Sequence, residues 1–179
     1  SNSVSSDSSG DSAASSISVD KAAAALLPAD IAKAGVLTIG VDPTYPPNEY
    51  KDDNGNPIGW DIELANAVAA KLGLKTDYQV ASFSNIIPSI VGGKVNAGVS
   101  SFTDNAEREA QVDFVNYYQA GILWASKKGN DVDPDNACGL KVAVQAGTYQ
   151  DTDELPGKSD DCTKAGKKAI DIVKFDTQD

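Results

Sequence analysis

The chain has 179 residues, of which 41% are hydrophobic and 23% charged, so it is long enough to bury at least one hydrophobic core. Its 26 acidic residues against 15 basic ones give a formal net charge of -11, which disfavours nucleic acid as a partner because phosphate contacts need clustered Lys and Arg. The chain contains no histidine, which excludes Ser/His/Asp triads, imidazole bases and histidine-containing zinc sites.

The N-terminal region differs in composition from the rest. Residues 1–18 are dominated by Ser, Asp, Ala and Gly, which cannot bury enough apolar surface to offset chain entropy, so we expect a disordered tether. An Ala-rich, weakly amphipathic helix is predicted from Lys21 to Lys33. The sequence shows no initiating Met and no hydrophobic signal core, so we expect a mature or engineered form of the protein.

From Gly35 onward, strand and helix patterns alternate, which predicts an α/β sheet. We expect strands at Val36–Val41, Thr76–Val80 and Val95–Val99, and a short helix at Ser84–Val91 in which Pro88 is tolerable only near the first turn. A longer helix is capped by Asp61 and ends before the left-handed terminator Gly73. Its apolar residues repeat at helical spacing: Ile62, Ala65, Val68, Ala69 and Leu72.

The run from Ser100 to Arg108 places hydroxyls, backbone N–H groups and one guanidinium at the end of an expected strand. Asp104 and Glu107 have the spacing of a capping box, which puts Arg108 in the first turn of a helix. Helix-start N–H groups attract anions, and a guanidinium can hold both oxygens of a carboxylate. The run therefore predicts a carboxylate-binding site. The alternative is a surface arginine on an ordinary capped helix.

A second region of this kind follows. We expect an extended segment at Gly121–Ser126, a polar loop at Lys127–Asn136 and a strand at Leu140–Gln145 that ends in Ala146-Gly147-Thr148. Ligand sites of α/β sheets lie beyond the carboxyl ends of strands, where both the Ser100 and the Gly147 motifs fall. The alternative for Gly147-Thr148 is an ordinary turn between a strand and a helix.

The chain has two cysteines, Cys138 and Cys162, without metal-site spacing. An even pair in a chain with an export-like N-terminus predicts one disulfide formed in an oxidising compartment. The alternative is two unrelated buried thiols.

A series of motifs runs from Gly35 to the end of the chain. They are Gly35–Tyr50, the Asn54-Gly55 turn, Gly59–Leu64, Phe83–Ile90, Val112–Phe114 and Val142–Thr148. In this order they resemble the extracellular solute-binding proteins of family 3, the amino-acid-binding receptors of ABC importers. The resemblance implies an α/β, two-lobed, periplasmic-binding-protein-like fold of type II, each lobe a sheet flanked by helices. We then expect residues 1–34 to be the tether and helix, 35–122 to be lobe 1 and 123–179 to be a partial lobe 2.

The resemblance also assigns ligand-binding roles. Ser100, Ser101, Thr103 and Arg108 match positions that hold the carboxylate and part of the ammonium group of an amino acid. Tyr45 matches an aromatic residue that covers the ligand side chain, and Asp42 matches a position facing its far end; the alternatives are core packing for Tyr45 and a turn role for Asp42. Trp60 and Phe83 line the pocket or are structural. The second lobe contributes Gln145, Gly147 and Thr148, with backbone N–H groups facing the ligand across a cleft.

The sequence departs from the family pattern in two places that matter. Asn48 stands where the family has Phe, which leaves side-chain specificity open and favours a polar ligand side chain. Compared with the family pattern, the chain also stops early at Asp179. We expect a fragment that lacks the rest of lobe 2, a carboxylate for the ligand ammonium and the second hinge, and that is a monomer or a swapped dimer.

The expected function is therefore that of an extracytoplasmic receptor. It captures a polar or charged amino acid between two lobes and delivers it to the permease of an ABC importer. We expect no catalysis, cofactor or metal, and a location in the periplasm, in secreted form, or on the outer face of the membrane as a lipoprotein whose anchor lies outside this sequence. The alternatives are the sensing domain of a membrane receptor and a dehydratase-like enzyme with Glu49 or Asp42 as its acid.

Overall fold

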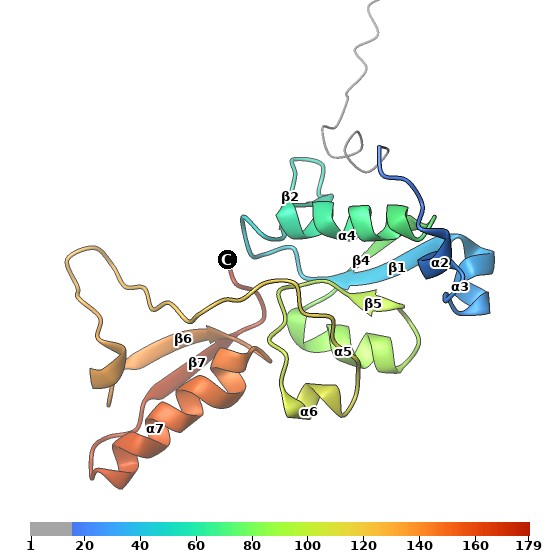
Figure 1. The fold of residues 1–179 in the computed structure, drawn as a ribbon. Helices are drawn as coiled ribbons and strands as arrows, with labels where there is room; N and C mark the ends of the chain where they lie inside the picture. Colours follow the sequence, from blue (N-terminus) through green and yellow to red (C-terminus); the bar gives the residue numbers. More distant parts are fainter. Residues whose placement is uncertain (1–15) are drawn as a thin grey trace, which may run out of the picture. The chain divides into compact units, whose positions relative to one another are not determined.

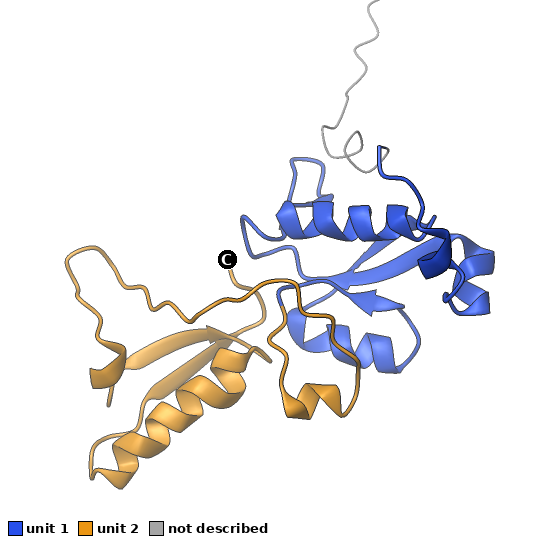
Figure 2. Cartoon of the chain, viewed as in Figure 1, with its two compact units in different colours: residues 1–101 blue, residues 102–179 orange. Residues whose placement is uncertain are grey.

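The computed structural model describes residues 16–179 and divides into two compact units, Ser1–Ser101 and Phe102–Asp179 (Figure 2). Most of the predicted tether, residues 1–15, lies outside the described residues. The division between the units follows Ser101, whereas the sequence puts the lobe boundary after residue 122. The units reflect where contacts are dense, so the lobe boundary at residue 122 stays a prediction.

Unit 1 is built on a three-stranded parallel sheet in the order β4-β1-β5. The strands are β1 (Val36–Val41), β4 (Lys75–Val80) and β5 (Ala97–Gly98). Ile39 and Val41 of the central strand are fully buried, as expected for a strand covered on both faces. The predicted strands are confirmed in place, although β5 is shorter than Val95–Val99 because only Ala97 and Gly98 pair with β1 in regular register.

Two helices cover this sheet on opposite faces (Figure 1). They are α4 (Trp60–Lys71), between β1 and β4, and α5 (Phe83–Val91), between β4 and β5. The first connection runs outward from the central strand and the second runs back across it, so right-handed crossovers place the helices on different sides. Gly73 follows α4 with φ 72°, which confirms the predicted terminator.

The helix starts differ from the prediction in two respects. Gly59 is the N-cap of α4, so Asp61 is a buried residue inside the first turn rather than the cap. Pro88 lies in the interior of α5, not near its first turn. A proline there removes the hydrogen bond to the carbonyl four residues earlier, and the short helix tolerates this because Ile86 packs it, fully buried, against the sheet.

A small antiparallel hairpin leads into α4. It consists of β2 (Tyr50–Lys51) and β3 (Pro57–Ile58). In its turn, Asp52 Oδ1 accepts hydrogen bonds from the N–H groups of Asn54 and Asn56 at 2.9 and 2.8 Å. Gly59 then crosses the preceding loop so closely that a Cβ would lie 2.1 Å from the carbonyl oxygen of Asn48, and its φ of 127° also requires glycine.

The predicted single helix from Lys21 to Lys33 is wrong. The structure contains two short helices, α2 (Lys21–Ala24) and α3 (Ala29–Ala34), and Pro28 is the N-cap of the second. Proline lacks an N–H group and clashes with the preceding turn, so the Ala-rich pattern could not continue through it.

Unit 2 contains one two-stranded parallel sheet, formed by β6 (Lys141–Gln145) and β7 (Asp171–Phe175). The crossover between these strands passes through the π-helical turn η2 (Gln150–Glu154) and helix α7 (Leu155–Lys164). Before β6 lie the one-turn helix α6 (Ala106–Glu109), a long segment without regular structure and the 3-10 turn η1 (Pro134–Asn136). The predicted strand at Leu140–Gln145 is confirmed, beginning one residue later.

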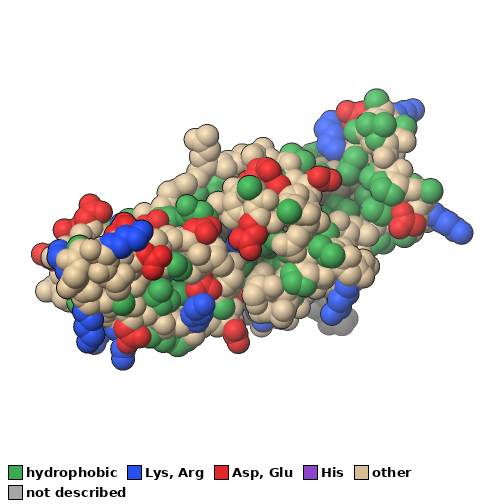
Figure 3. All heavy atoms as spheres, turned by 90° about the horizontal axis from the view of Figure 1, so that it is seen from below, with side chains coloured by type: hydrophobic (Ala, Val, Ile, Leu, Met, Phe, Trp, Pro, Cys, Tyr) green, Lys and Arg blue, Asp and Glu red, His purple; other side chains and the backbone are tan. Residues whose placement is uncertain are grey.

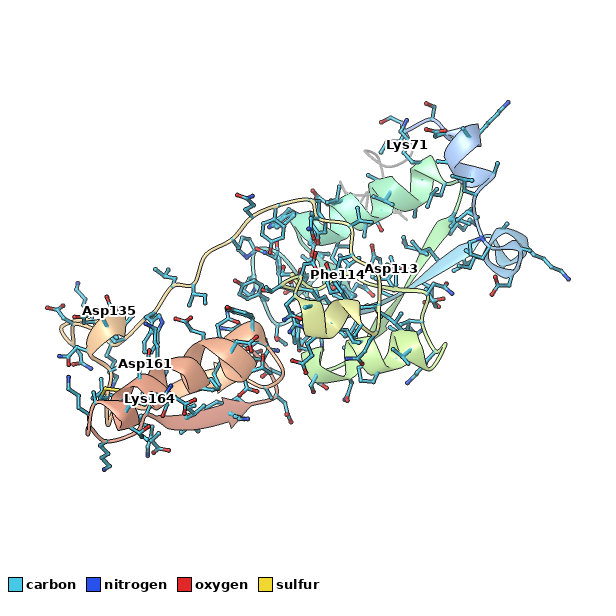
Figure 4. The ribbon with its side chains drawn as sticks, turned by 60° about the horizontal axis from the view of Figure 1, so that its bottom comes forward. Lys71, Asp113, Phe114, Asp135, Asp161 and Lys164 are labelled. Carbon is cyan, nitrogen blue, oxygen red and sulfur yellow. A yellow bond between two sulfur atoms is a disulfide. The ribbon has the colours of Figure 1, made fainter. Side chains whose placement is uncertain are left out.

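A small core and a disulfide hold unit 2 together. Buried Ala137, Cys162 and Ile170 pack with partly buried residues that include Trp124 and Val142. Cys138 and Cys162 form a disulfide with a Cα–Cα distance of 5.6 Å, and Figure 4 shows it as a yellow bond. The predicted pairing is thereby confirmed. In the chain-entropy description, closing a loop of this size contributes on the order of 3 kcal/mol.

The surface carries charges of both signs. On the face shown in Figure 3, Lys and Arg side chains are scattered among acidic and apolar ones and do not gather into one basic area. No helix within residues 16–179 has the length and apolar character needed to cross a membrane.

Candidate ligand-binding site

The carboxyl ends of β1 and β5 meet at Asp42 and Ser100. The N–H group of Asp42 donates to Ser100 Oγ at 3.1 Å, and the two residues are 4% and 5% exposed. The strand order reverses at this pair of neighbouring strands, which is where α/β sheets place their ligand crevice. Two of the predicted site residues are thus brought together by the sheet itself.

The Asp42 carboxylate is engaged by its own unit. It accepts hydrogen bonds from the N–H group of Phe83 at 3.0 Å and from the hydroxyl of Thr44 at 2.7 Å. These contacts hold the first residue of α5 and the turn after β1, so they support the turn-forming alternative for Asp42. Phe83, the first residue of α5, is itself buried.

Ser101 adopts a left-handed backbone conformation, with φ 56°, which is uncommon for a residue other than glycine. Its hydroxyl donates to Glu49 Oε1 at 2.6 Å and accepts from Asn48 Nδ2 at 3.0 Å. Asn48, which the sequence marked as a departure from the family pattern, therefore holds a residue of the candidate site.

Glu49 and Asp61 form a buried acidic pair beside Ser101. Both are 0% exposed. Burial, together with the neighbouring Asp61 carboxyl, raises the pKa of Glu49 to about 9, and the hydrogen bond from Ser101 opposes this rise. Sequence reasoning missed the pair: it treated Asp61 as a helix cap and Glu49 only as the acid of an enzyme. The available signal was an acidic residue next to the apolar start of α4.

Two of the three aromatic residues predicted near the ligand lie at the surface. Tyr45 is 43% exposed and Trp60 is 36% exposed. Plain core packing, the alternative for Tyr45, is therefore wrong. Its backbone pairs with that of Glu49 through hydrogen bonds of 2.7 and 2.9 Å. A role in covering a ligand side chain stays a prediction.

Arg108 lies in the first turn of the capped helix α6, but the N-cap is not the predicted residue. Asn105, rather than Asp104, is the N-cap of α6, and its side-chain oxygen accepts a hydrogen bond from the Arg108 N–H group at 2.9 Å. Asn105 has the extended backbone that an N-cap requires, and an amide caps as well as a carboxylate does. Figure 4 labels Asp113 and Phe114, which follow this turn.

The Arg108 guanidinium is buried and held at two points. It is 8% exposed, and it donates to the carbonyl oxygens of Thr103 at 2.7 Å and Gly147 at 2.9 Å. Its Cζ lies 5.6 Å from the centre of the Phe102 ring. The alternative of an ordinary surface arginine is therefore wrong.

Burial removes water from the charge of Arg108. Burial lowers its pKa, while the negative charges of Asp153 and Glu107 act in the opposite direction. Guanidinium remains protonated in proteins, so the group is a desolvated cation at neutral pH. A group of this kind binds a carboxylate more strongly than an exposed arginine does, because the interaction takes place at lower dielectric.

The strand β6 is followed by the predicted turn at Gly147-Thr148, but the N–H group of Gly147 is not free for a ligand as predicted. Gly147 has φ 77°, and the Thr148 hydroxyl donates to the Gln145 carbonyl at 2.8 Å. The Gly147 N–H group, however, donates to Asp151 Oδ2 at 2.9 Å instead of being presented to a ligand. Lys174 Nζ lies 3.0 Å from the other oxygen of Asp151. Sequence reasoning missed Asp151, although an acidic residue just after a glycine turn is a common partner for its N–H groups.

A groove on unit 1 lies apart from these residues. It runs along the outer side of α4 beside the N-terminal segment, and none of the predicted site residues lines it. Its lining consists of Ser16, Ile17, Ser18, Leu64, Ala67, Val68 and Lys71. Throughout the part of the chain that the structure describes, no group of three or more acidic or cysteine residues has a geometry that could hold a metal ion.

Comparisons with known proteins agree on one family. The family of bacterial extracellular solute-binding proteins, family 3, matches residues 37–177. The arginine-binding protein ArgT of Corynebacterium glutamicum is 41% identical over 157 residues, which are 87% of this chain and 52% of that protein. The chain thus spans about half the length of the curated relatives it matches.

Solved structures of amino-acid-binding proteins have the same fold. An ancestral arginine-binding protein bound to arginine matches with a TM-score of 0.68 and 35% identity, over 80% of this chain and 62% of that one. The ancestral amino-acid-binding protein AncCDT-1, a precursor of cyclohexadienyl dehydratase, matches with a TM-score of 0.66 and 32% identity, over 83% of this chain and 64% of that one. The predicted α/β, two-lobed fold class is confirmed.

Proposed function

Because the chain belongs to the bacterial extracellular solute-binding proteins of family 3, we propose that it is a receptor that binds a polar or charged amino acid and delivers it to an ABC importer. Its relatives are binding proteins, and a solute-binding role follows from the family. The delivery step, the ligand class and a location in the periplasm or on a lipid anchor are parts of the proposal.

The buried Arg108 carries this proposal. Its guanidinium is 8% exposed and is oriented by the carbonyl oxygens of Thr103 and Gly147, which come from segments far apart in the sequence. A carboxylate that reaches this cation gains hydrogen bonds to a charged group, each contributing roughly 1.5 to 3 kcal/mol. Every amino acid provides that carboxylate, so Arg108 accounts for the class of ligand and not for the choice among amino acids.

Arginine is the first ligand to test. Relatives with 41% and 35% identity are named as arginine-binding proteins. The acidic balance of the chain, with a net charge of -11, also favours a cationic ligand in long-range attraction. Asp42, which directly follows β1, remains our candidate for a contact with the ligand side chain.

A thermal-shift screen of the twenty amino acids tests this function. We would screen this chain and, in parallel, a chimera that continues it with the part of the Corynebacterium glutamicum relative outside the match. A ligand at 100 times its dissociation constant stabilises a protein by about 2.7 kcal/mol, which gives a clear shift. We expect arginine or another polar amino acid to raise the melting temperature of the chimera. No response to any amino acid in either protein would contradict the proposal.

Arg108→Ala is the matched variant for the site. We expect it to weaken binding of every ligand by a hundredfold or more, on the order of the energy of two charged hydrogen bonds. Lys164→Ala is the control, because Lys164 is an exposed cation of the same unit (Figure 4). Equal binding by the Arg108→Ala protein would show that the carboxylate is held elsewhere.

One comparison supports an enzymatic function as the alternative proposal. AncCDT-1 is described as a precursor of a cyclohexadienyl dehydratase, and it shares 32% identity with this chain. The acids suggested for such a reaction, Asp42 and Glu49, are 4% and 0% exposed and are engaged within unit 1. Turnover of a cyclic carboxylic acid by the chimera would favour the enzyme over the receptor.

A further inference from the structure

Among the described residues of unit 1, Glu49 and Asp61 are the most deeply buried ionisable groups, and the receptor function as such does not use them. Resting on the proposed function, we propose that the two carboxyl groups share a single proton, and that protonated Glu49 is the positioning residue that holds Ser101 in place for ligand binding. The inference concerns a residue that acts through Ser101 and makes no ligand contact of its own.

The backbone brings the two acids together and keeps them there. Glu49 follows the turn that pairs it with Tyr45, through hydrogen bonds of 2.7 and 2.9 Å between their backbones. The N–H group of Asp61, in the first turn of α4, donates to the Asn48 carbonyl at 3.2 Å. The close crossing at Gly59 joins these segments. Neither side chain can turn to solvent without breaking this packing.

Two adjacent carboxylates cannot both be charged in such a place. The side chains of Glu49 and Asp61 are 0% exposed, and Asp61 lies near enough to raise the pKa of the Glu49 carboxyl. If both were ionised, two negative charges would lie together without water to screen them. Asp42 adds further negative charge at Glu49, and Tyr78, whose hydroxyl donates to Asn66 Oδ1 at 2.5 Å, lies near Asp61. Repulsion between like charges in this buried place keeps one proton on the pair.

The hydrogen bonds at Glu49 show which oxygen carries that proton. Glu49 Oε1 accepts from the Ser101 hydroxyl at 2.6 Å. Glu49 Oε2 is buried and receives no hydrogen bond from any described donor. A proton on Oε2 turns this oxygen into a donor toward Asp61, which satisfies it. Burial of the pair raises the pKa of Glu49 to about 9, so the proton is retained at neutral pH.

Ser101 depends on this arrangement. Its φ of 56° is a left-handed conformation that costs a residue with a Cβ on the order of 1 kcal/mol, so other contacts must stabilise it. Those contacts are the hydrogen bonds of its hydroxyl with Glu49 and Asn48. The Ser101 hydrogen bond by itself favours ionised Glu49, but burial and Asp61 outweigh it. Loss of the proton would therefore place two negative charges side by side, separate the carboxyl groups and release Ser101. Ligand binding should therefore weaken at alkaline pH.

The first experiment observes the proton without a ligand. The carbon-13 shift of the Glu49 carboxyl is followed by NMR from pH 4 to pH 11 in this chain and in the Asp61→Asn variant. We expect the Glu49 signal to keep its protonated value at pH 7 in the parent, and its midpoint to fall in Asp61→Asn because the neighbouring charge is gone. A midpoint near the ordinary glutamate value in the parent would overturn proton sharing.

The second experiment measures ligand affinity against pH by calorimetry, with the chimera and arginine. The affinity of Glu49→Ala for arginine should be at least tenfold lower than that of the parent at pH 7. Glu49→Gln should recover most of that affinity, because its amide can both accept from Ser101 and donate to Asp61. Glu63→Gln, a change of an exposed residue in α4, the helix that contains Asp61, should bind arginine with the affinity of the parent. The ammonium group of the ligand also titrates at alkaline pH, so the diagnostic quantity is the ratio of dissociation constants of Glu49→Gln and parent. This ratio should fall by up to tenfold per pH unit above about pH 9.

The two proposals fail in different ways. If the parent chimera binds no amino acid at any pH, the receptor function fails, while the NMR titration still decides whether the proton is shared. If the parent binds arginine and Glu49→Ala binds it equally well, or if the ratio does not change with pH, the positioning role is overturned and the receptor function stands.

Discussion

Replacement of Glu49 by Gln should make the stability of unit 1 less dependent on pH. The pKa of Glu49 is raised from 4.5 in the unfolded chain to about 9 in the folded one. Between these values the folded state binds more protons than the unfolded state, so stability falls as the pH rises. Each pH unit in this window costs the parent roughly 1.4 kcal/mol of unfolding free energy through this group, and Gln cannot titrate. The unfolding free energy of the Gln variant, relative to that of the parent, should therefore rise by roughly 4 kcal/mol between pH 5 and pH 8.

Urea unfolding at several pH values measures this difference. The chain has two tryptophans, Trp60 in unit 1 and Trp124 in unit 2, so a Trp124→Phe background makes fluorescence report on unit 1. Glu63→Gln is the control, since this exposed group should leave the pH profile of the parent unchanged. A constant difference between Glu49→Gln and parent from pH 5 to pH 8 would refute the argument, because it would mean that Glu49 titrates equally in both states.

Three further predictions concern the stability of particular elements. Gly59→Ala should destabilise unit 1 by about 3 kcal/mol or more, because the new Cβ would lie 2.1 Å from the Asn48 carbonyl oxygen; Gly55→Ala, at φ 82° with nothing within 4 Å, should cost only about 1 kcal/mol in the same urea assay. The double variant Cys138→Ser/Cys162→Ser should lose on the order of 3 kcal/mol of unfolding free energy in unit 2, and a reducing agent that destabilises the parent should leave this variant unaffected. Asn105→Ala should cost about 1 kcal/mol through loss of the helix cap at Arg108, whereas Asn105→Asp should retain it; equal stability of the two would contradict the cap seen here.

The sequence alone predicted much of the local structure, because local structure depends on near neighbours. The apolar run at Val36–Val41 forms the central strand, and Gly73 adopts the left-handed conformation expected at a helix end. The disulfide followed from a chain with only two cysteines. The family also followed from the sequence, since its motifs are read in order along the chain. Local patterns failed where a competing local effect was stronger, as at Pro28, which divides the predicted N-terminal helix.

Only the tertiary structure decided what the polar residues of the candidate site do. Nothing in the segment around Arg108 indicated that its guanidinium would reach the carbonyl oxygen of Gly147, because that contact joins residues 39 positions apart. The Gly147 N–H group was expected to face a ligand, but Asp151 accepts its hydrogen bond. Glu49 and Asp61 were ordinary surface acids by residue type, and the folded chain buries both beside Ser101. Burial and long-range hydrogen bonds set the charge and orientation of these groups, and both arise only when distant segments pack together.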